Sequence, residues 1–273
     1  FLPTDPNERV VFIPQESLFL VPFTALKDAN GKYLIEKHTI LTAPSIQVLE
    51  LTQQQRQRLS TPNTRTIQGK DALVVGNPKM PFLKEGDFAG QLQPLPFAEQ
   101  EAKEIAKLLN TKAITGSEAT KENIMQQLRS AKLVHLATHG ILDDVKKLGV
   151  PGAIALAPSK DDEGFLTAGE IFDLRLNAEL VVLSACDTGQ GKITGDGVIG
   201  LSRSLISAGT PSVIVSLWSI PDAPSALLMT EFYRNFTANP DKAQALRQAM
   251  LTTMKQNRNP YNWAAFTLIG EAD

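Results

Sequence analysis

Short apolar runs rich in β-branched residues alternate with amphipathic helical segments from residue 71 onward. Near-continuous apolar strands that alternate with helices are typical of a mostly parallel sheet with helices on both faces. The sequence therefore predicts an α/β fold. The expected strands are 72–76, 112–114, 132–138, 153–157, 179–186, 212–218 and 266–269, and the expected helices are 98–109, 121–131, 167–173, 198–208, 222–236 and 241–256.

The N-terminal part of the chain has a different pattern. Two apolar runs within residues 10–22 predict a pair of strands in a hairpin. Ser45 precedes a helical pattern and is the expected N-cap of that helix. Residues 53–70 are polar and rich in turn formers, which predicts a linker. We therefore expect a small strand-rich N-terminal subdomain over 1–70 and a larger α/β domain over 71–273.

The composition excludes several classes of protein. Hydrophobic residues make up 42% of the 273 residues and charged residues 21%, which is ordinary for a soluble globular protein. A net charge of −2 favours neither nucleic acid nor an anionic membrane as partner. No apolar stretch is long enough to predict a membrane span, and no signal peptide is recognisable. The chain does not begin with Met, so we expect it to be the C-terminal part of a longer protein.

A cysteine and a histidine end two of the predicted strands. Cys186 is the only cysteine in the chain; it closes an apolar run and is followed by turn-forming residues. His139 lies 47 positions earlier (186 − 139) and closes another such run just before Gly140. Sites in open α/β sheets gather at the carboxyl ends of strands. The pattern predicts that a thiol nucleophile and an imidazole base meet in one site.

The simpler interpretations of these residues remain open at this stage. A lone cysteine at the end of a strand is often a buried core residue. A single cysteine also excludes internal disulfides and fits a reducing, cytoplasmic compartment. His135 lies in mid-strand and is expected to be a hydrogen-bonded core residue, whereas His38 is expected at the surface. The backbone N–H of Gly140 could serve an oxyanion hole, or Gly140 could simply form a turn. The His-x-x-x-His spacing does not favour zinc, because the segment lacks the helix and Glu of that motif.

A glycine pattern supplies a competing hypothesis. Residues 195–200 match G-x-G-x-x-G, and Asp222 follows at about the distance expected of a dinucleotide-binding fingerprint. The polar residues 187–194 separate this pattern from the preceding strand, so we expect the glycines to lie in a loop. Neither a G-x-S-x-G elbow nor a P-loop motif is present in the sequence.

Three motifs together resemble one protein family. They are His-Leu-Ala-Thr-His-Gly at 135–140, Leu-Ser-Ala-Cys-Asp-Thr-Gly at 183–189 and Ser-Leu-Trp-Ser-Ile-Pro-Asp at 216–222. In this order they are similar to the CHAT family, the caspase-like domain associated with TPR repeats. Weaker matches extend the resemblance from near residue 10 to near residue 250. The resemblance implies a caspase–hemoglobinase fold, with 1–70 as the N-terminal part of the CHAT region and 71–273 as the catalytic domain.

The resemblance also implies a catalytic machinery. His139 would be the general base and Cys186 the nucleophile of a cysteine endopeptidase, and the N–H groups of Gly140 and Cys186 would form the oxyanion hole. No cofactor or metal is implied. The expected partners are a protein substrate and an upstream TPR or other sensor region, with neither nucleic acid nor membrane, in a bacterial cytoplasmic protein. A catalytically silent interaction module of the same fold is the alternative.

The substrate pocket is less well defined by the motifs. Asp222, Trp218 and Asp187 are the expected substrate-binding residues. Asp222 occupies the position at which separase-like relatives hold a basic P1 side chain, although it could equally be the N-cap of the helix that follows. Metacaspases place an Asp two residues before the nucleophile, where this chain has Ser184. The P1 preference therefore stays open.

Overall fold

A central mixed sheet organises the chain. The computed structural model describes residues 2–5, 8–59, 69–83, 90–141, 152–184, 195–218 and 220–273. Eight strands of these residues form the sheet. In order across it they are β1 (Arg9–Phe12), β2 (Thr39–Thr42), β13 (Phe266–Gly270), β12 (Ser212–Ser216), β11 (Leu180–Leu183), β7 (Leu133–Ala137), β3 (Ala72–Pro78) and β6 (Ala113–Gly116).

The sheet is mostly parallel, as the sequence predicts. β12, β11, β7, β3 and β6 all run in one direction, so their carboxyl ends share one edge. The direction reverses once, because β13 is antiparallel to β12 and parallel to β2. The carboxyl ends of β7 and β11 therefore lie next to each other at the same edge.

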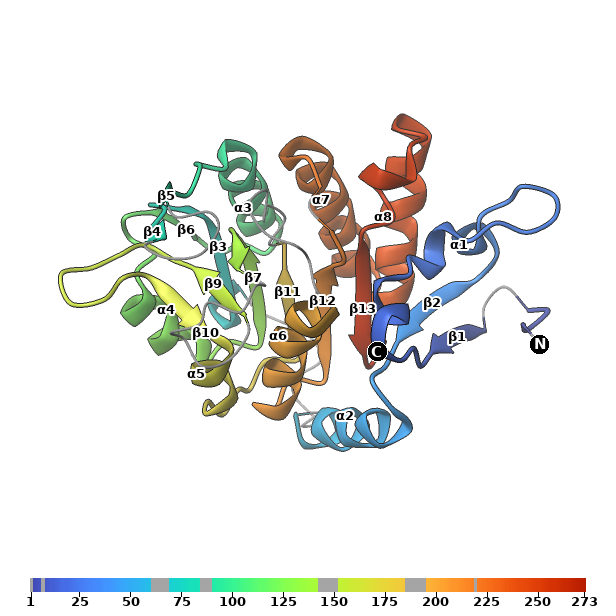
Figure 1. Cartoon of the computed structure of the whole chain (residues 1–273), viewed down its shortest axis with the longest axis horizontal. Coiled ribbons are helices and arrows are strands. Elements are labelled where there is room, and N and C mark those ends of the chain that lie inside the picture. Colours follow the sequence, from blue (N-terminus) through green and yellow to red (C-terminus); the bar gives the residue numbers. More distant parts are fainter. Residues whose placement is uncertain are drawn as a thin grey trace.

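Helices cover both faces of the sheet (Figure 1). One face carries α3 (Pro96–Leu108), α7 (Asp222–Ala238) and α8 (Lys242–Gln256), and the other carries α2 (Ile46–Leu59), α4 (Lys121–Leu128), α5 (Ala168–Phe172) and α6 (Gly195–Ser207). Side chains of β11 alternate between two separate cores: Val182 packs toward α7 and Val181 toward α6. This alternation confirms the expected α/β architecture.

Smaller elements surround the central sheet. A three-stranded antiparallel sheet has the order β10-β9-β8, and a two-stranded sheet pairs β4 with β5. The bounds of these and the remaining elements are β4 (Phe82–Leu83), β5 (Gly90–Gln91), β8 (Gly140–Ile141), β9 (Ala153–Ala155), β10 (Phe165–Thr167), α1 (Leu34–Lys37) and the 3₁₀ turns η1 (Glu16–Leu20), η2 (Phe23–Ala25), η3 (Gly69–Asp71) and η4 (Pro260–Asn262).

Local sequence explains where several helices begin. Thr120 Oγ1 accepts a hydrogen bond from the backbone N–H of Asn123 and caps α4. Thr167 caps α5 in the same way and shares a reciprocal capping box with Glu170. Ser45 Oγ accepts from Val48 N at 3.2 Å, so Ser45 is the N-cap expected for α2.

The N-terminal segment differs from the hairpin that the sequence predicts. β1 pairs with β2 in parallel, and the residues after β1 form the 3₁₀ turn η1 instead of a second strand. Only two residues separate the apolar runs, but the second run forms no strand, and β1 pairs instead with β2, which begins at Thr39. The predicted linker is also wrong over residues 53–59, which belong to α2. Its Gln, Arg and Leu residues are good helix formers.

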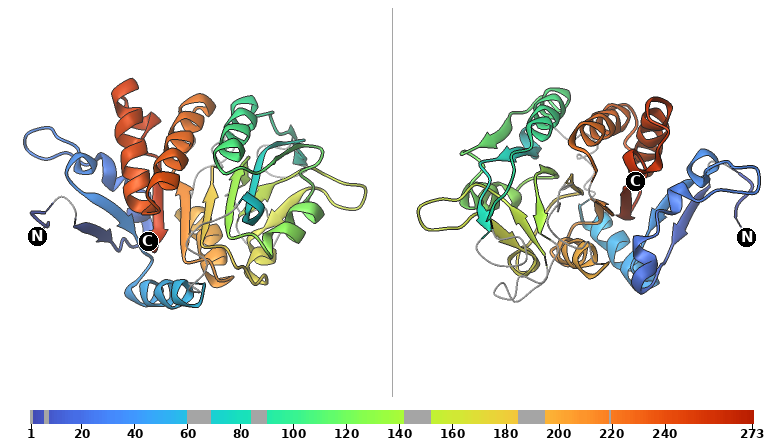
Figure 2. Two further views of the ribbon diagram at one scale, coloured as in Figure 1. Left: turned by 180° about the vertical axis from the view of Figure 1, so that it is seen from behind. Right: turned by 45° about the horizontal axis from the view of Figure 1, so that its top comes forward.

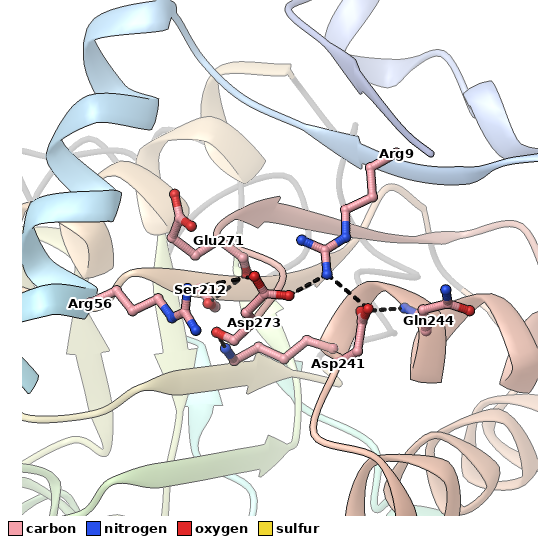
Figure 3. A network of polar contacts seen from close by, with 8 residues as sticks. Arg9, Arg56, Ser212, Asp241, Gln244, Glu271 and Asp273 are labelled. Atoms are coloured by element: carbon pink, nitrogen blue, oxygen red, sulfur yellow. Dashed lines mark hydrogen bonds and ion pairs between the residues drawn. The ribbon is translucent and has the colours of Figure 1, made fainter. Parts of the chain in front are cut away.

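Both N-terminal strands extend the main sheet at its far end. Figure 2 shows this segment in blue at one end of the molecule, with β6, α4, β9 and β10 in green and yellow toward the other. Arg9 on β1 pairs with Asp241 at the start of α8 at 2.8 Å and also with Asp273 (Figure 3). Residues 8–42 are thus tied to the C-terminal strand and helix. The domain division at residue 70 stays a prediction.

Two further expectations concern α6 and the membrane. The sequence predicts a helix from residue 198 with the glycines before it in a loop, but α6 already begins at Gly195. The G-x-G-x-x-G residues are therefore its first six positions. Within the described ranges, no helix combines the length and apolar character needed to cross a lipid bilayer.

Candidate active site

His139 lies just beyond the carboxyl end of β7. Its side chain is only 2% exposed, and Nε2 lies 2.7 Å from the backbone carbonyl oxygen of Gln93. A carbonyl can only accept a hydrogen bond, so Nε2 carries the hydrogen in this contact. In the neutral ring the basic nitrogen is then Nδ1. The contact with Gln93 therefore selects the tautomer in which Nδ1 is the nitrogen that can accept a proton.

The backbone on either side of His139 is held by β9. Ala155 N donates to the carbonyl of His139 at 2.9 Å, and Thr138 Oγ1 donates to the carbonyl of Ala155 at 2.7 Å. Gly140 is the next residue and lies opposite Ile154. Pairs along an antiparallel ladder alternate between bonded and non-bonded, so the N–H of Gly140 points away from β9. The oxyanion-hole role expected for Gly140 agrees with this direction and stays a prediction.

Asp222 is the first residue of α7 and contacts the beginning of α3. Its carboxylate accepts a hydrogen bond from the backbone N–H of Phe97 at 2.8 Å and another from Ala98. Burial raises the pKa of the Asp222 carboxyl, while these bonds and the electrostatic attraction of His139 oppose the rise. The alternative that Asp222 caps its own helix is wrong, because the N-cap of α7 is Pro221. Asp222 instead caps α3 from a neighbouring element.

Trp218 lies after β12 and contacts a distant turn. Its Nε1–H donates to the backbone carbonyl of Tyr261 at 2.9 Å, and the two rings stack with centroids 6.2 Å apart. The Tyr261 side chain is exposed. Trp218 is thus a half-buried ring anchored to η4, and the expectation that it lines a substrate pocket is still untested.

Cys186 and Asp187 lie outside the described residues, and so does the proposed contact of the thiol with His139. The strands that lead to them are described. In the β7–β11 pairing, Leu180 lies opposite Leu133 and Leu183 opposite Leu136. Paired residues are thus 47 positions apart, the same separation as between His139 and Cys186. Ser184 is buried, and its Oγ lies 3.2 Å from Ser225 Oγ on α7.

The other two histidines are both buried. His135 is the hydrogen-bonded core residue that the sequence predicts: Nε2 lies 2.8 Å from Glu101 Oε1, and Nδ1 lies 3.3 Å from the Tyr233 hydroxyl. His38, expected at the surface, is only 7% exposed. Its polar neighbours suggested exposure, but it connects α1 to β2 and faces the interior. Within the described residues, no group of three or more His, Cys, Asp or Glu side chains could hold a metal ion.

The sequence analysis gave three residues near the site no functional role. Gln93 contributes only a backbone oxygen, for which a sequence carries no signal. Glu101 could have been found, because it lies three residues after Ala98 on the apolar face of the predicted helix. A charged residue at a buried helical position requires a partner. Tyr233 is one of several aromatic residues on α7 and has no distinctive pattern.

A family comparison now identifies the chain. The model of the CHAT domain matches residues 3–271. The chain belongs to the CHAT domain family. Two curated relatives of this CHAT domain are tetratricopeptide repeat protein 28 of Mus musculus and of Homo sapiens; each is 31% identical over 302 residues that include 98% of this chain. The chain spans about an eighth of these relatives, 12% of their length. Both are mammalian, so a bacterial source stays a prediction.

Solved structures of a separase and of a cysteine proteinase have a similar fold. The Saccharomyces cerevisiae separase–securin complex aligns with 95% of this chain and 15% of that chain, with a TM-score of 0.62 and 14% sequence identity. The Arg-specific cysteine proteinase gingipain R aligns with 85% of this chain and 54% of that chain, with a TM-score of 0.54 and 15% identity. This CHAT domain therefore has a caspase-like fold, which at such identities establishes the architecture alone.

Proposed function

We propose that this CHAT domain is a cysteine endopeptidase in which His139 activates the Cys186 thiol. The observation that carries the proposal is the register of β7 and β11, which brings residues 47 positions apart opposite each other. Extended by three residues, that register would place Cys186 beside His139. The tautomer selected by Gln93 supports the same role for His139, because it leaves Nδ1 as the basic nitrogen.

The proposed reaction follows the chemistry of a thiol nucleophile. His139 Nδ1 takes the proton of the Cys186 thiol, and the thiolate attacks the scissile carbonyl carbon of an extended peptide. The carbonyl electrons move onto oxygen, where the N–H groups of Gly140 and Cys186 stabilise the negative charge. The C–N bond then breaks as His139 returns the proton to the leaving amine. Water, deprotonated by His139, hydrolyses the thioester and releases the acid.

Asp222 is proposed to bind a basic P1 side chain. A carboxylate has about four lone-pair sites, and the amides of Phe97 and Ala98 account for two bonds. Capacity thus remains for a guanidinium or ammonium group near the base. Asp187 and Trp218 are proposed to line the same pocket. The solved gingipain relative is described as Arg-specific, which agrees with a basic P1 residue.

The partners proposed for the enzyme follow from its relatives. Both curated relatives are named for tetratricopeptide repeats, and this chain matches only 12% of their length. We propose that a TPR or similar sensor region acts upstream of the domain and controls access of a protein substrate. The separase of similar fold was solved in complex with securin, which is a precedent for the binding of another protein.

A cleavage survey with a single substitution tests the proposal. Lysates exposed to the wild-type protein, with its upstream region, are compared with lysates exposed to Cys186→Ala by mass spectrometry of new N-termini. We expect new cleavage sites that disappear in Cys186→Ala, because a dyad loses nearly all activity when its nucleophile is removed. Identical cleavage by both proteins would contradict the mechanism. No cleavage by either protein, in the presence of its partner, would favour the silent interaction module.

A dinucleotide site has no support in the structure. The Rossmann fingerprint requires its glycines in the turn between a strand and a helix. Here Gly195 is already helical, and β11 ends at Leu183.

A further inference from the structure

Three buried polar side chains lie under the candidate site and take no part in the proposed chemistry. Glu101 on α3, His135 on β7 and Tyr233 on α7 are each no more than 1% exposed. One arrangement of hydrogens satisfies them all: the Tyr233 hydroxyl donates to His135 Nδ1, and His135 Nε2–H donates to Glu101 Oε1. Burial raises the pKa of the Tyr233 hydroxyl above its ordinary value, which keeps the proton on this donor. We call these residues the buried triad.

Stability alone does not account for the buried triad. Taking a carboxylate and an imidazole out of water is costly, and well-packed apolar residues of similar volume often stabilise a fold at least as well. The surrounding core is apolar: Val182, Phe232 and Leu228 belong to the same cluster and are fully buried. Hydrogen bonds differ from apolar contacts in that they fix direction and register. A role in alignment therefore fits the buried triad better than a role in stability.

The three elements joined by the buried triad also carry the groups around His139. His139 lies four residues after His135, just beyond the end of β7, and Gln93 lies in the segment that leads into α3. Asp222 begins α7 and bonds to the first turn of α3. α3 is further seated on β3 at Gly76, where an added Cβ would lie 2.4 Å from the Ala98 carbonyl oxygen.

We propose that the buried triad is a positioning network that fixes α3 and α7 against β7 and thereby aligns the Gln93 carbonyl with His139 Nε2. Glu101 sets the rotation of α3, and the segment before α3 carries Gln93. His135 holds both helices through its two ring nitrogens. The inference rests on the proposed function in one respect: the alignment serves catalysis only if His139 is the general base.

Nuclear magnetic resonance of the histidine rings tests the proposal without any substrate. The chain has three histidines, so long-range ¹H–¹⁵N spectra contain few signals, and His38→Gln assigns one of them. The apolar variant Glu101→Leu/His135→Leu/Tyr233→Phe retains His38 and His139. We expect it to stay folded while His139 loses its preference for the Nε2–H tautomer. A folded variant with an unchanged His139 signal would overturn the proposal.

Kinetics add a second readout when a peptide substrate is available. We expect kcat of the apolar variant to fall at least tenfold with KM within twofold, because the three substituted side chains are buried and do not contact the peptide. Glu101→Gln keeps an acceptor for His135 and is expected to retain the His139 signal and most of kcat. Ile124→Val, buried on the opposite face of the sheet, controls for a general loss of packing. Equal losses of kcat in Ile124→Val and the apolar variant would contradict positioning.

Two other outcomes can be distinguished from a failure of the proposal: an unfolded variant and an inactive wild-type protein. If the apolar variant does not fold, Tyr233→Phe removes a single hydroxyl and is examined in the same spectra; a His139 signal unchanged by that substitution would also overturn the proposal. If the wild-type protein cleaves nothing, the proposed function fails, while the tautomer of His139 still decides whether the buried triad positions it.

Discussion

At the scale of single residues, the site depends on contacts that are short and directional. The tautomer of His139 follows from one backbone oxygen, that of Gln93, at 2.7 Å. His135 is held on both sides by polar side chains, so two histidines four residues apart have different surroundings. The sequence predicts this difference from position alone, since His135 is in mid-strand and His139 at its exit. It predicts nothing about Gln93, because a backbone acceptor can belong to any residue.

Gly76 shows how one residue sets the distance between two elements. It lies on β3 where α3 approaches most closely, and a Cβ there would meet Ala98 O and Ala102 Cβ at 2.4 Å. Gly76→Ala is expected to lower the free energy of unfolding by about 1–3 kcal/mol, typical of overpacking a core. Urea denaturation measures this directly. Unchanged stability would mean that α3 moves away without cost, and α3 would then not be fixed against β3.

At the scale of helices and strands, the sequence predicts the central elements well and the edges poorly. β3, β7, β11 and β12 are continuous apolar runs, which have few alternative structures. The prediction of an N-terminal hairpin is wrong because β1 pairs with β2, which is distant in the chain. The local sequence pattern of a strand does not specify its pairing partner. Helix α6 begins three residues earlier than expected, because glycine lowers helix propensity without forbidding a helix.

Asp222 joins two helices by capping one from the start of the other. Its carboxylate accepts hydrogen bonds from Phe97 and Ala98 in the first turn of α3, where backbone N–H groups lack helical partners. Asp222→Ala is expected to cost about 1 kcal/mol of unfolding free energy, as for the loss of an N-cap. Asp222→Asn keeps an acceptor oxygen and is expected to lose much less. Equal losses in chemical denaturation would contradict the capping role.

At the scale of the whole molecule, a charged cluster joins parts that are distant in sequence. Figure 3 shows Arg9 paired with both Asp241 and Asp273. Nearby, Ser212 Oγ donates to the carbonyl of Glu271 at 2.7 Å. Ser212 begins β12, so the cluster lies at the edge of the sheet opposite His139. The site edge and this edge are therefore stabilised by separate interactions.

Lys242 makes the free energy of unfolding depend on pH. Burial, aided by the charge of Arg56, lowers the pKa of the Lys242 ammonium to about 8, while an unfolded lysine has a pKa of about 10.4. Between these values the unfolded chain binds more protons, so the free energy of unfolding rises with pH in that window. Below pH 8 the buried ammonium is charged and costs stability.

Lys242→Met removes this charge and tests whether it destabilises the folded protein. The variant is expected to be more stable at pH 7 by roughly 1–3 kcal/mol, since one pKa unit corresponds to about 1.4 kcal/mol. The loss of the hydrogen bond from Lys242 to the Asp273 carbonyl reduces this gain. The gain is expected to shrink between pH 8 and about 10.4. Denaturation across this range provides the measurement. A difference in the free energy of unfolding that stays constant with pH would contradict a lowered pKa of Lys242.

The reactivity of the single cysteine tests the proposed dyad most directly. Because Cys186 is the only thiol, the rate of alkylation by iodoacetamide as a function of pH reports on it alone. We expect reaction of the wild-type protein to follow an inflection below about pH 7.5, and that of His139→Gln an inflection near 8.5, where an unperturbed thiol titrates. Identical pH profiles for the two proteins would show that His139 does not act on Cys186.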